Sequence, residues 1–197
     1  STDDFSFTTE EEEPTETTPS SWTISLGVAE ADGQNIDLTF GVDPTGTTGV
    51  DAGLNEVVQP PLPPAGSFDT RFSDNGGLLV DVRENANGTE HTLPLAFQRA
   101  AGGAITLTWD ESAVAEATTA AKIQDAFGGL LGIDVDMRTE NSVTIANAAI
   151  TSVVMTFTST DDFSFTTEEE EPTETTPSSW TISLGVAEAD GQNIDLT

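Results

Sequence analysis

Apolar and polar residues alternate along much of this chain, as in strands that bury one face. Apolar side chains occupy every second position from 22 to 28 and again from 36 to 38, on either side of a polar turn at 31–34. This period of two predicts a pair of antiparallel strands joined by a short turn. An isolated hairpin is only marginally stable in water, so the pair is expected to belong to a larger sheet.

The same alternation recurs between turns rich in Gly, Asn and Asp, and it predicts about nine strands in all. The further strands are expected at 67–72, 78–83, 91–98, 104–109, 133–138, 142–146 and 150–158. An Ala-rich stretch at 110–121 predicts a short helix or a loop, with Asp110 or Ser112 as its N-cap. The predicted fold class is therefore all-β, an antiparallel β-sandwich of immunoglobulin-like or jelly-roll-like type. Trp22 and Trp109 fall on its inward positions.

The chain contains a long internal duplication. Residues 159–197 are identical to residues 1–39, which predicts a window from a tandem array with a repeat unit of 158 residues. The expected organisation is an acidic, Thr- and Pro-rich linker at 1–21 and a β-sandwich domain at 22–158. The next repeat then supplies a linker at 159–179 and its first two strands at 180–197. We predict that these linkers dock on domain surfaces as added edge strands and make the contacts between units. The apolar anchors of this docking would be Phe5, Phe7, Phe163 and Phe165.

The charge of the chain is strongly negative. It carries 35 acidic and 5 basic residues, a net charge of −30, and the only lysine is Lys122. Such a charge repels phosphate backbones and anionic headgroups, so nucleic acid is not an expected partner and cations are. Two explanations remain open: a halophilic surface that salt screens, which the scarcity of lysine favours, or calcium-binding loops. The five cations are scarce, and Arg71, Arg83, Arg99 and Arg138 are expected to pair with carboxylates.

The candidate metal site lies in a loop rich in Gly and Asp. Asp43, Asp51 and Glu56 offer the oxygen ligands that Ca²⁺ prefers, although no EF-hand spacing is present. A solvated acidic loop is the alternative. No other cofactor is predicted, and no apolar run is long enough for a transmembrane segment.

Catalytic constellations are weak. Asp134 and Asp136 alternate with apolar residues and should face solvent, and His91 is the single histidine of a chain without cysteine. Acidic pairs arise freely in so acidic a chain, and a triad would require His91 to lie beside both a nucleophile and a carboxylate. The sequence therefore predicts a protein that is not an enzyme.

Several strings together resemble a family. They are LTFGVDP at 38–44, TGVD at 48–51, PPLPP at 60–64, FDTRF at 68–72, ITLTWD at 105–110 and IDVDMR at 133–138. The pattern is similar to a β-sandwich domain repeated in secreted and cell-surface proteins of the type IX secretion kind, here with the acidity of a halophilic bacterium. Asn55 departs from the glycine usual at that position. The resemblance implies an extracellular, non-catalytic module.

The leading functional hypothesis is a structural protein. Identical repeats favour a long extracellular fibre or cell-surface filament whose partners are neighbouring copies of the same repeat, because length and repeated contacts require many copies of one unit. The alternative is an adhesin or carbohydrate-binding module repeated for avidity.

Overall fold

The computed structural model describes residues 20–86, 88–160, 184–187 and 193–196. The chain divides into two compact units, Ser1–Phe163 and Ser164–Thr197, and each is described by itself. The predicted anchors Phe5, Phe7, Phe163 and Phe165 lie outside the described residues. Within those residues, no helix has the length and apolar character needed to cross a membrane.

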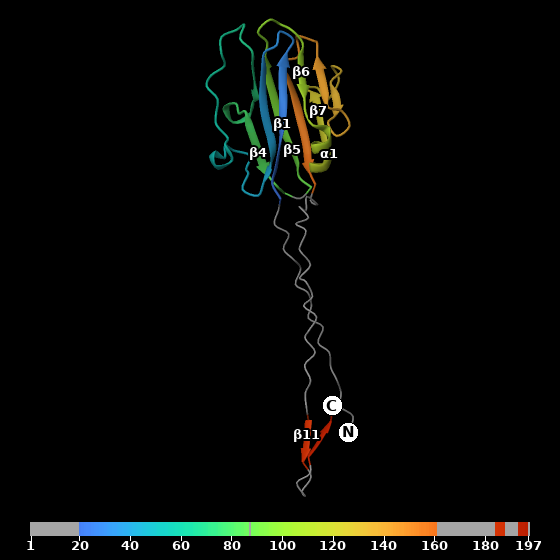
Figure 1. The fold of residues 1–197 in the computed structure, drawn as a ribbon. Coiled ribbons are helices and arrows are strands. Elements are labelled where there is room, and N and C mark those ends of the chain that lie inside the picture. Colours follow the sequence, from blue (N-terminus) through green and yellow to red (C-terminus); the bar gives the residue numbers. More distant parts are fainter. Residues whose placement is uncertain (1–19, 87, 161–183, 188–192, 197) are drawn as a thin grey trace. The chain divides into compact units, whose positions relative to one another are not determined.

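Two five-stranded sheets make up the first unit (Figure 1). The first sheet, in the order β4-β2-β1-β6-β9, contains β1 (Trp22–Glu30), β2 (Asn35–Asp43), β4 (Val80–Glu84), β6 (Ile105–Thr108) and β9 (Ser142–Ile145). The second sheet, in the order β3-β5-β10-β7-β8, contains β3 (Asp69–Phe72), β5 (Glu90–Gln98), β7 (Thr118–Asp125), β8 (Asp134–Asp136) and β10 (Ser152–Ser159). Within residues 20–86 and 88–160, two 3-10 turns, Ala52–Leu54 and Asp74–Gly76, and one short helix accompany the sheets. The all-β, sandwich-like class is as predicted.

One strand pair departs from the predicted antiparallel arrangement. β2 and β4 run parallel, with Thr39 opposite Val80 and Asp43 opposite Glu84. A parallel neighbour requires a crossover connection. Residues 44–79 provide it, because they contribute β3 to the other sheet before the chain returns to the first. Alternation looks the same in parallel and antiparallel strands, so the sequence pattern could not reveal this pair.

The core forms from the inward residues of both sheets. In β1, every second residue from Trp22 to Glu30 is buried, which confirms the predicted alternation. Trp22, Phe40 and Phe157 meet edge to face or tilted, with ring centroids 5.5–5.9 Å apart. Each large apolar side chain that is fully buried contributes about 1.5–3 kcal/mol to folding. Trp109 is also buried and donates its indole N–H to the carbonyl of Met137, as its inward position predicts.

The Ala-rich stretch forms both a helix and a strand. Helix α1 (Glu111–Ala117) is capped by Asp110, whose carboxylate accepts from the amides of Ser112 and Ala113. The predicted short helix and one of its two candidate caps are therefore confirmed. The prediction missed β7, which starts at Thr118. Its first residues are Thr and Ala, and this composition hides the alternation that Ile123 then continues.

The second copy of the duplicated sequence repeats the hairpin in the same register. β11 (Leu184–Ala187) pairs with β12 (Asn193–Leu196), with Leu184 opposite Leu196. The equivalent pair in the first copy is Leu26 opposite Leu38. The local sequence alone therefore accounts for the turn and the pairing.

The first strand of the domain, β1, begins at the same end at which its last strand, β10, finishes (Figure 1). We call this the terminal end. The indole N–H of Trp22, at the start of β1, donates to the hydroxyl of Ser159, at the end of β10, over 3.1 Å. Beside them, Asn85 binds the carbonyl of Ser20 and the amide of Thr160 binds the carbonyl of Ala117. The chain thus enters and leaves the domain side by side.

The opposite, distal end gathers the turns between strands. The carboxylate of Glu30, at the end of β1, accepts from the amides of Ala100, Ala101 and Gly103 in the β5–β6 turn. The strand register also brings Asp125, at the end of β7, next to Val153 at the start of β10. The β1–β2, β5–β6, β7–β8 and β9–β10 connections therefore lie at this end.

Candidate functional site

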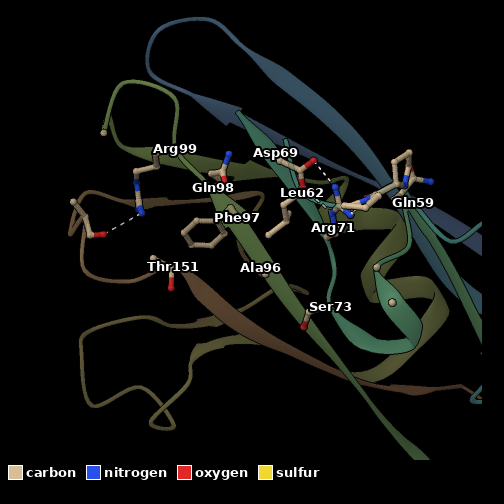
Figure 2. A pocket seen from close by; sticks show the side chains of 16 residues that line it. Gln59, Leu62, Asp69, Arg71, Ser73, Ala96, Phe97, Gln98, Arg99 and Thr151 are labelled. Carbon is tan, nitrogen blue, oxygen red and sulfur yellow. Dashed lines mark hydrogen bonds and ion pairs between the residues drawn. The ribbon is translucent and has the colours of Figure 1, made fainter. Parts of the chain in front are cut away.

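A cavity of about 910 Å³ opens on the outer face of the second sheet, toward the distal end (Figure 2). Its walls come from the proline-rich segment, from β3 and β5, and from the β5–β6 and β9–β10 connections. The lining residues are Gln59, Pro60, Pro61, Leu62, Asp69, Arg71, Ser73, Gly76, Gly77, Ala96, Phe97, Gln98, Arg99, Gly102, Ala148 and Thr151. Pockets of this size are common in ligand-binding proteins.

The pairing of β3 with β5 positions one wall. Asp69 lies opposite Gln98 and Arg71 opposite Ala96, so these four residues share the outer face. The Arg71 guanidinium binds both carboxylate oxygens of Asp69, at 2.8 and 2.6 Å, and donates to the carbonyl of Pro60 at 2.8 Å. The hydrogen bonds that Arg71 donates to Asp69 raise the pKa of Arg71. This charge-assisted pair ties the proline-rich segment to the sheet.

Gly77 leaves room for the side chain of Arg71 to pack directly against the backbone of residue 77. Its φ is +97°, and a Cβ there would lie 2.5 Å from Cδ of Arg71. A larger residue would therefore push the guanidinium away from Asp69. The Gln98 amide adds a second tether, because its Nε2 donates to the carbonyls of Pro63, Pro64 and Ser67.

Arg99 builds the other wall. Its Nε donates to the carbonyl of Gly103 at 2.8 Å, and its Nη1 donates to that of Ile150 at 2.8 Å. The guanidinium carbon lies 5.0 Å from the centroid of the Phe97 ring. Burial lowers the pKa of Arg99, although the side chain remains a cation near neutral pH. Arg71 pairs with a carboxylate as predicted, whereas Arg99 donates its hydrogen bonds to backbone carbonyls of the β5–β6 and β9–β10 connections.

The residues that line the cavity favour a ligand held by apolar contacts and a complementary shape. Pro60, Pro61, Leu62 and Ala96 provide apolar carbon, and the charged groups Asp69 and Arg71 already bind each other. Figure 2 shows Leu62 beside this ion pair, with Phe97 and Arg99 farther along the wall.

Candidate catalytic residues lie elsewhere. His91, at the terminal end of β5, packs on Phe157 with ring centroids 5.2 Å apart. Burial, with a smaller effect of Arg83, lowers the pKa of His91. Asp134 and Asp136 are exposed on the outer face of β8, as the alternation predicts.

A second feature of the distal end is the loop 126–132 between β7 and β8. Its Phe127, Leu130 and Leu131 are 65%, 85% and 49% exposed. The loop is held by the buried carboxylate of Asp125, which accepts hydrogen bonds from the amides of Phe127, Gly129, Leu131 and Ile133. Burial by itself would raise the pKa of Asp125, but these four donors outweigh burial and hold that pKa below its usual value.

Sequence reasoning missed both distal features. The cavity lining comes from four separate stretches, so no local motif marks it. The loop did carry a signal, because a Gly-rich turn is usually polar whereas this one contains Phe127, Leu130 and Leu131.

The two ends of the domain differ in charge. Segments 60–68, 99–104, 126–133 and 146–151, at or near the distal end, contain no Asp or Glu. The connections 43–51, 84–90 and 109–118 at the terminal end each contain at least two. The acidity of the chain is therefore concentrated away from the cavity and the apolar loop.

The predicted calcium ligands have partners inside the protein. Asp43 accepts from the amide and hydroxyl of Thr45, which lower its pKa, and Asp51 accepts from the amide and hydroxyl of Thr47. Glu56 is buried and accepts from the amide of Asp51 at 2.7 Å. The described part of the chain has no group of three or more His, Cys, Asp or Glu side chains that could hold a metal ion. The calcium site stays a prediction.

Glu56 belongs to a buried polar cluster that the sequence did not reveal. Its second oxygen accepts from the amide of Val82 at 2.6 Å, next to the buried ion pair of Arg83 with Asp81. Burial raises the pKa of Asp81 to about 6, although Arg83 opposes the shift. The cluster fastens the long excursion after β2 to the edge strand β4.

Comparisons of the chain with protein-family models, with curated proteins and with solved structures find no match. The resemblance to repeated β-sandwich domains of the type IX secretion kind therefore stays a prediction.

Proposed function

We propose that this chain is part of a repetitive structural protein, a long extracellular fibre or cell-surface filament. The observation that carries the proposal is the duplication: residues 159–197 repeat residues 1–39 without a change, and both copies pair the same residues in the same hairpin register. An array of identical units provides length and repeated contacts, which a single catalytic site does not require.

The geometry of the domain refines this proposal. Because the chain enters and leaves at the terminal end, each domain would be attached to the array at that end and would project its distal end outward. The filament would then consist of linkers carrying lateral domains. The acidic 1–21 and 159–179 segments serve as these linkers in the proposal, and the immunoglobulin-like or jelly-roll-like subtype belongs to it as well.

The charge supports an extracellular, high-salt setting. A net charge of −30 keeps a protein soluble where salt screens repulsion, and the chain has no cysteine that oxidation could alter. Calcium bound near Asp43 and Asp51 is the alternative use of the acidity, and thermal melting in NaCl and in CaCl₂ separates the two.

Limited proteolysis of the native protein tests the array. Proteases that cut exposed linkers should produce a ladder whose steps correspond to a 158-residue unit, and electron microscopy should show filaments with regularly spaced lateral domains. A native protein with no such ladder and no filament would contradict the proposal.

A binding module repeated for avidity is the second candidate. The observation in its favour is the cavity of about 910 Å³ with an apolar wall and tethered polar groups. Glycan-array binding that Leu62→Asp abolishes would favour this candidate over the structural protein.

A further inference from the structure

We propose that the distal end of the domain docks against the distal end of a second copy of this chain. The docking surface consists of the apolar loop residues Phe127, Leu130 and Leu131 together with the cavity beside Leu62. The inference rests on the proposed array, since it names the partner that each lateral domain would meet. It was not contained in the sequence-based prediction, which placed the contacts between units in the linkers.

Electrostatics selects this end for contact between copies. Two chains that each carry a net charge of −30 repel each other, and like charges brought together at an interface are costly. Segments 99–104, 126–133 and 146–151 contain no acidic residue, and Arg99 is their only charge. Asp32 and Asp134 are exposed acids at this end, and the cavity adds Asp69, whose charge Arg71 neutralises. Copies can therefore approach at the distal end with the least repulsion.

The apolar loop exposes large side chains and is held in place by hydrogen bonds. Leu130 is 85% exposed and Phe127 65% exposed, although large apolar side chains normally avoid water. The four amide hydrogen bonds to Asp125 hold the loop that carries Phe127 and Leu130 in one conformation. A rigid loop loses little conformational entropy when it binds, so its exposed carbon is available for association.

The projecting loop and the cavity lie toward the same end of one domain, and this arrangement suits a pair of identical surfaces. In a two-fold contact, the loop of each copy can enter the cavity of the other, so that every contact occurs twice. The cavity wall is apolar at Pro61, Leu62 and Ala96, which matches Phe127 and the two leucines.

A second copy fits these features better than a lipid surface. A neutral bilayer could accept the apolar loop, but it would leave the cavity and its tethered walls without a role. A protein partner with an exposed apolar loop of this kind uses both, and in the proposed array such a partner would be present at high local concentration.

Sedimentation velocity of the 197-residue chain tests the proposal. In about 1 M NaCl, where the Debye length is about 3 Å, the chain should form dimers as its concentration rises. The double variant Phe127→Asp with Leu130→Asp should weaken dimerisation at least about tenfold, as should Leu62→Asp. The matched control, Val50→Asp with Val57→Asp, adds the same two charges at exposed valines outside the docking surface and should dimerise like the unmodified chain.

Four results would overturn the proposal. The first is that the chain stays monomeric at all concentrations in high salt, and the second is that the control and loop variants weaken the dimer equally. The third is that Leu62→Asp dimerises normally. The fourth is that a monomeric chain binds phosphatidylcholine vesicles in a flotation assay and that this binding depends on Phe127. The last result would assign the loop to a lipid surface. Thermal melting of every variant confirms folding. None of these results bears on the covalent array, which the proteolytic ladder tests separately.

Discussion

At the residue scale, two buried carboxylates show how surroundings decide the state of an acid. Asp125 and Asp81 are both 1% exposed. Asp125 accepts four backbone hydrogen bonds, which lower its pKa despite burial, whereas burial raises the pKa of Asp81 to about 6 even beside Arg83. The first acid organises a loop as an anion, and the second is protonated over part of the mildly acidic range.

Asp125→Asn should destabilise the domain and loosen the distal loop. The amide has a single acceptor oxygen, and its NH₂ group would face amides that also donate, so several hydrogen bonds would be lost. The melting temperature should fall by roughly 5 °C. Hydrogen exchange at Phe127, Gly129 and Leu131 should accelerate. The control Asp37→Asn alters an exposed acid on β2 and should change neither quantity; equal effects would contradict the role assigned to Asp125.

Asp81 should make stability fall as pH rises from about 4 to about 6. Its folded pKa of about 6 lies above the usual 3.8, so the folded state binds the proton more tightly and is favoured most below pH 4. The contribution is on the order of 2–3 kcal/mol. Above pH 6 it is lost.

Urea unfolding of the chain and of Asp81→Asn across this range provides the measurement. The free energy of unfolding should decline more steeply with pH in the unmodified chain. His91 acts in the opposite direction, because its lowered pKa favours the folded state at higher pH, but it is present in both proteins. Identical pH slopes would show that Asp81 does not carry the effect.

At the element scale, the β1–β2 hairpin is specified by its own local sequence, since both copies of that sequence form the hairpin in one register. Its strands approach closely at Gly41, which lies opposite Thr23. A Cβ at Gly41 would fall 2.0 Å from the carbonyl oxygen of Trp22. The absence of a side chain there lets Trp22 reach Ser159 and close the terminal end.

Gly41→Ala should therefore destabilise the domain by about 2–3 kcal/mol, because the added methyl group forces β1 and β2 apart. Near-ultraviolet circular dichroism should report the displaced Trp22, and thermal melting the lost stability. Gly53→Ala is the matched control, because a Cβ there meets nothing within 4 Å and the backbone has no positive φ. Equal melting temperatures for the two variants would contradict the predicted clash.

At the scale of the whole molecule, charge dominates. The acids concentrate at the terminal end and in the linker sequences, while the distal connections are nearly uncharged. Repulsion among the acids acts over roughly the Debye length, so it should depend on ionic strength at the terminal end more than at the distal end. This asymmetry gives the domain one end suited to solvent and one suited to contact.

The melting temperature should rise with NaCl. The Debye length falls from about 30 Å at 0.01 M to about 3 Å at 1 M, which relieves the repulsion among the acids. Differential scanning calorimetry in NaCl and in CaCl₂ measures the effect. A gain that millimolar calcium supplies completely and molar NaCl does not supply would exclude salt adaptation and favour the site near Asp43, Asp51 and Glu56.

The local features could be predicted from the sequence: the alternation that forms β1, β2 and β5, a short helix capped by Asp110 or Ser112, the inward positions of Trp22 and Trp109, and the exact duplication. These follow from neighbours in the chain, since side-chain period and capping hydrogen bonds span only a few residues. Even the outward positions of Asp134 and Asp136 follow from it.

The choice of neighbouring strands, and of the connections that share an end, depends on the packing of the whole domain. The parallel pairing of β4 with β2 depends on a crossover of the chain, and β7 is a strand because β10 pairs with it despite a composition that suggests a helix. The cavity lining and the gathering of connections with few acids at the distal end likewise join segments far apart in sequence. Long-range pairing is chosen by the burial of the whole core, which no local pattern encodes.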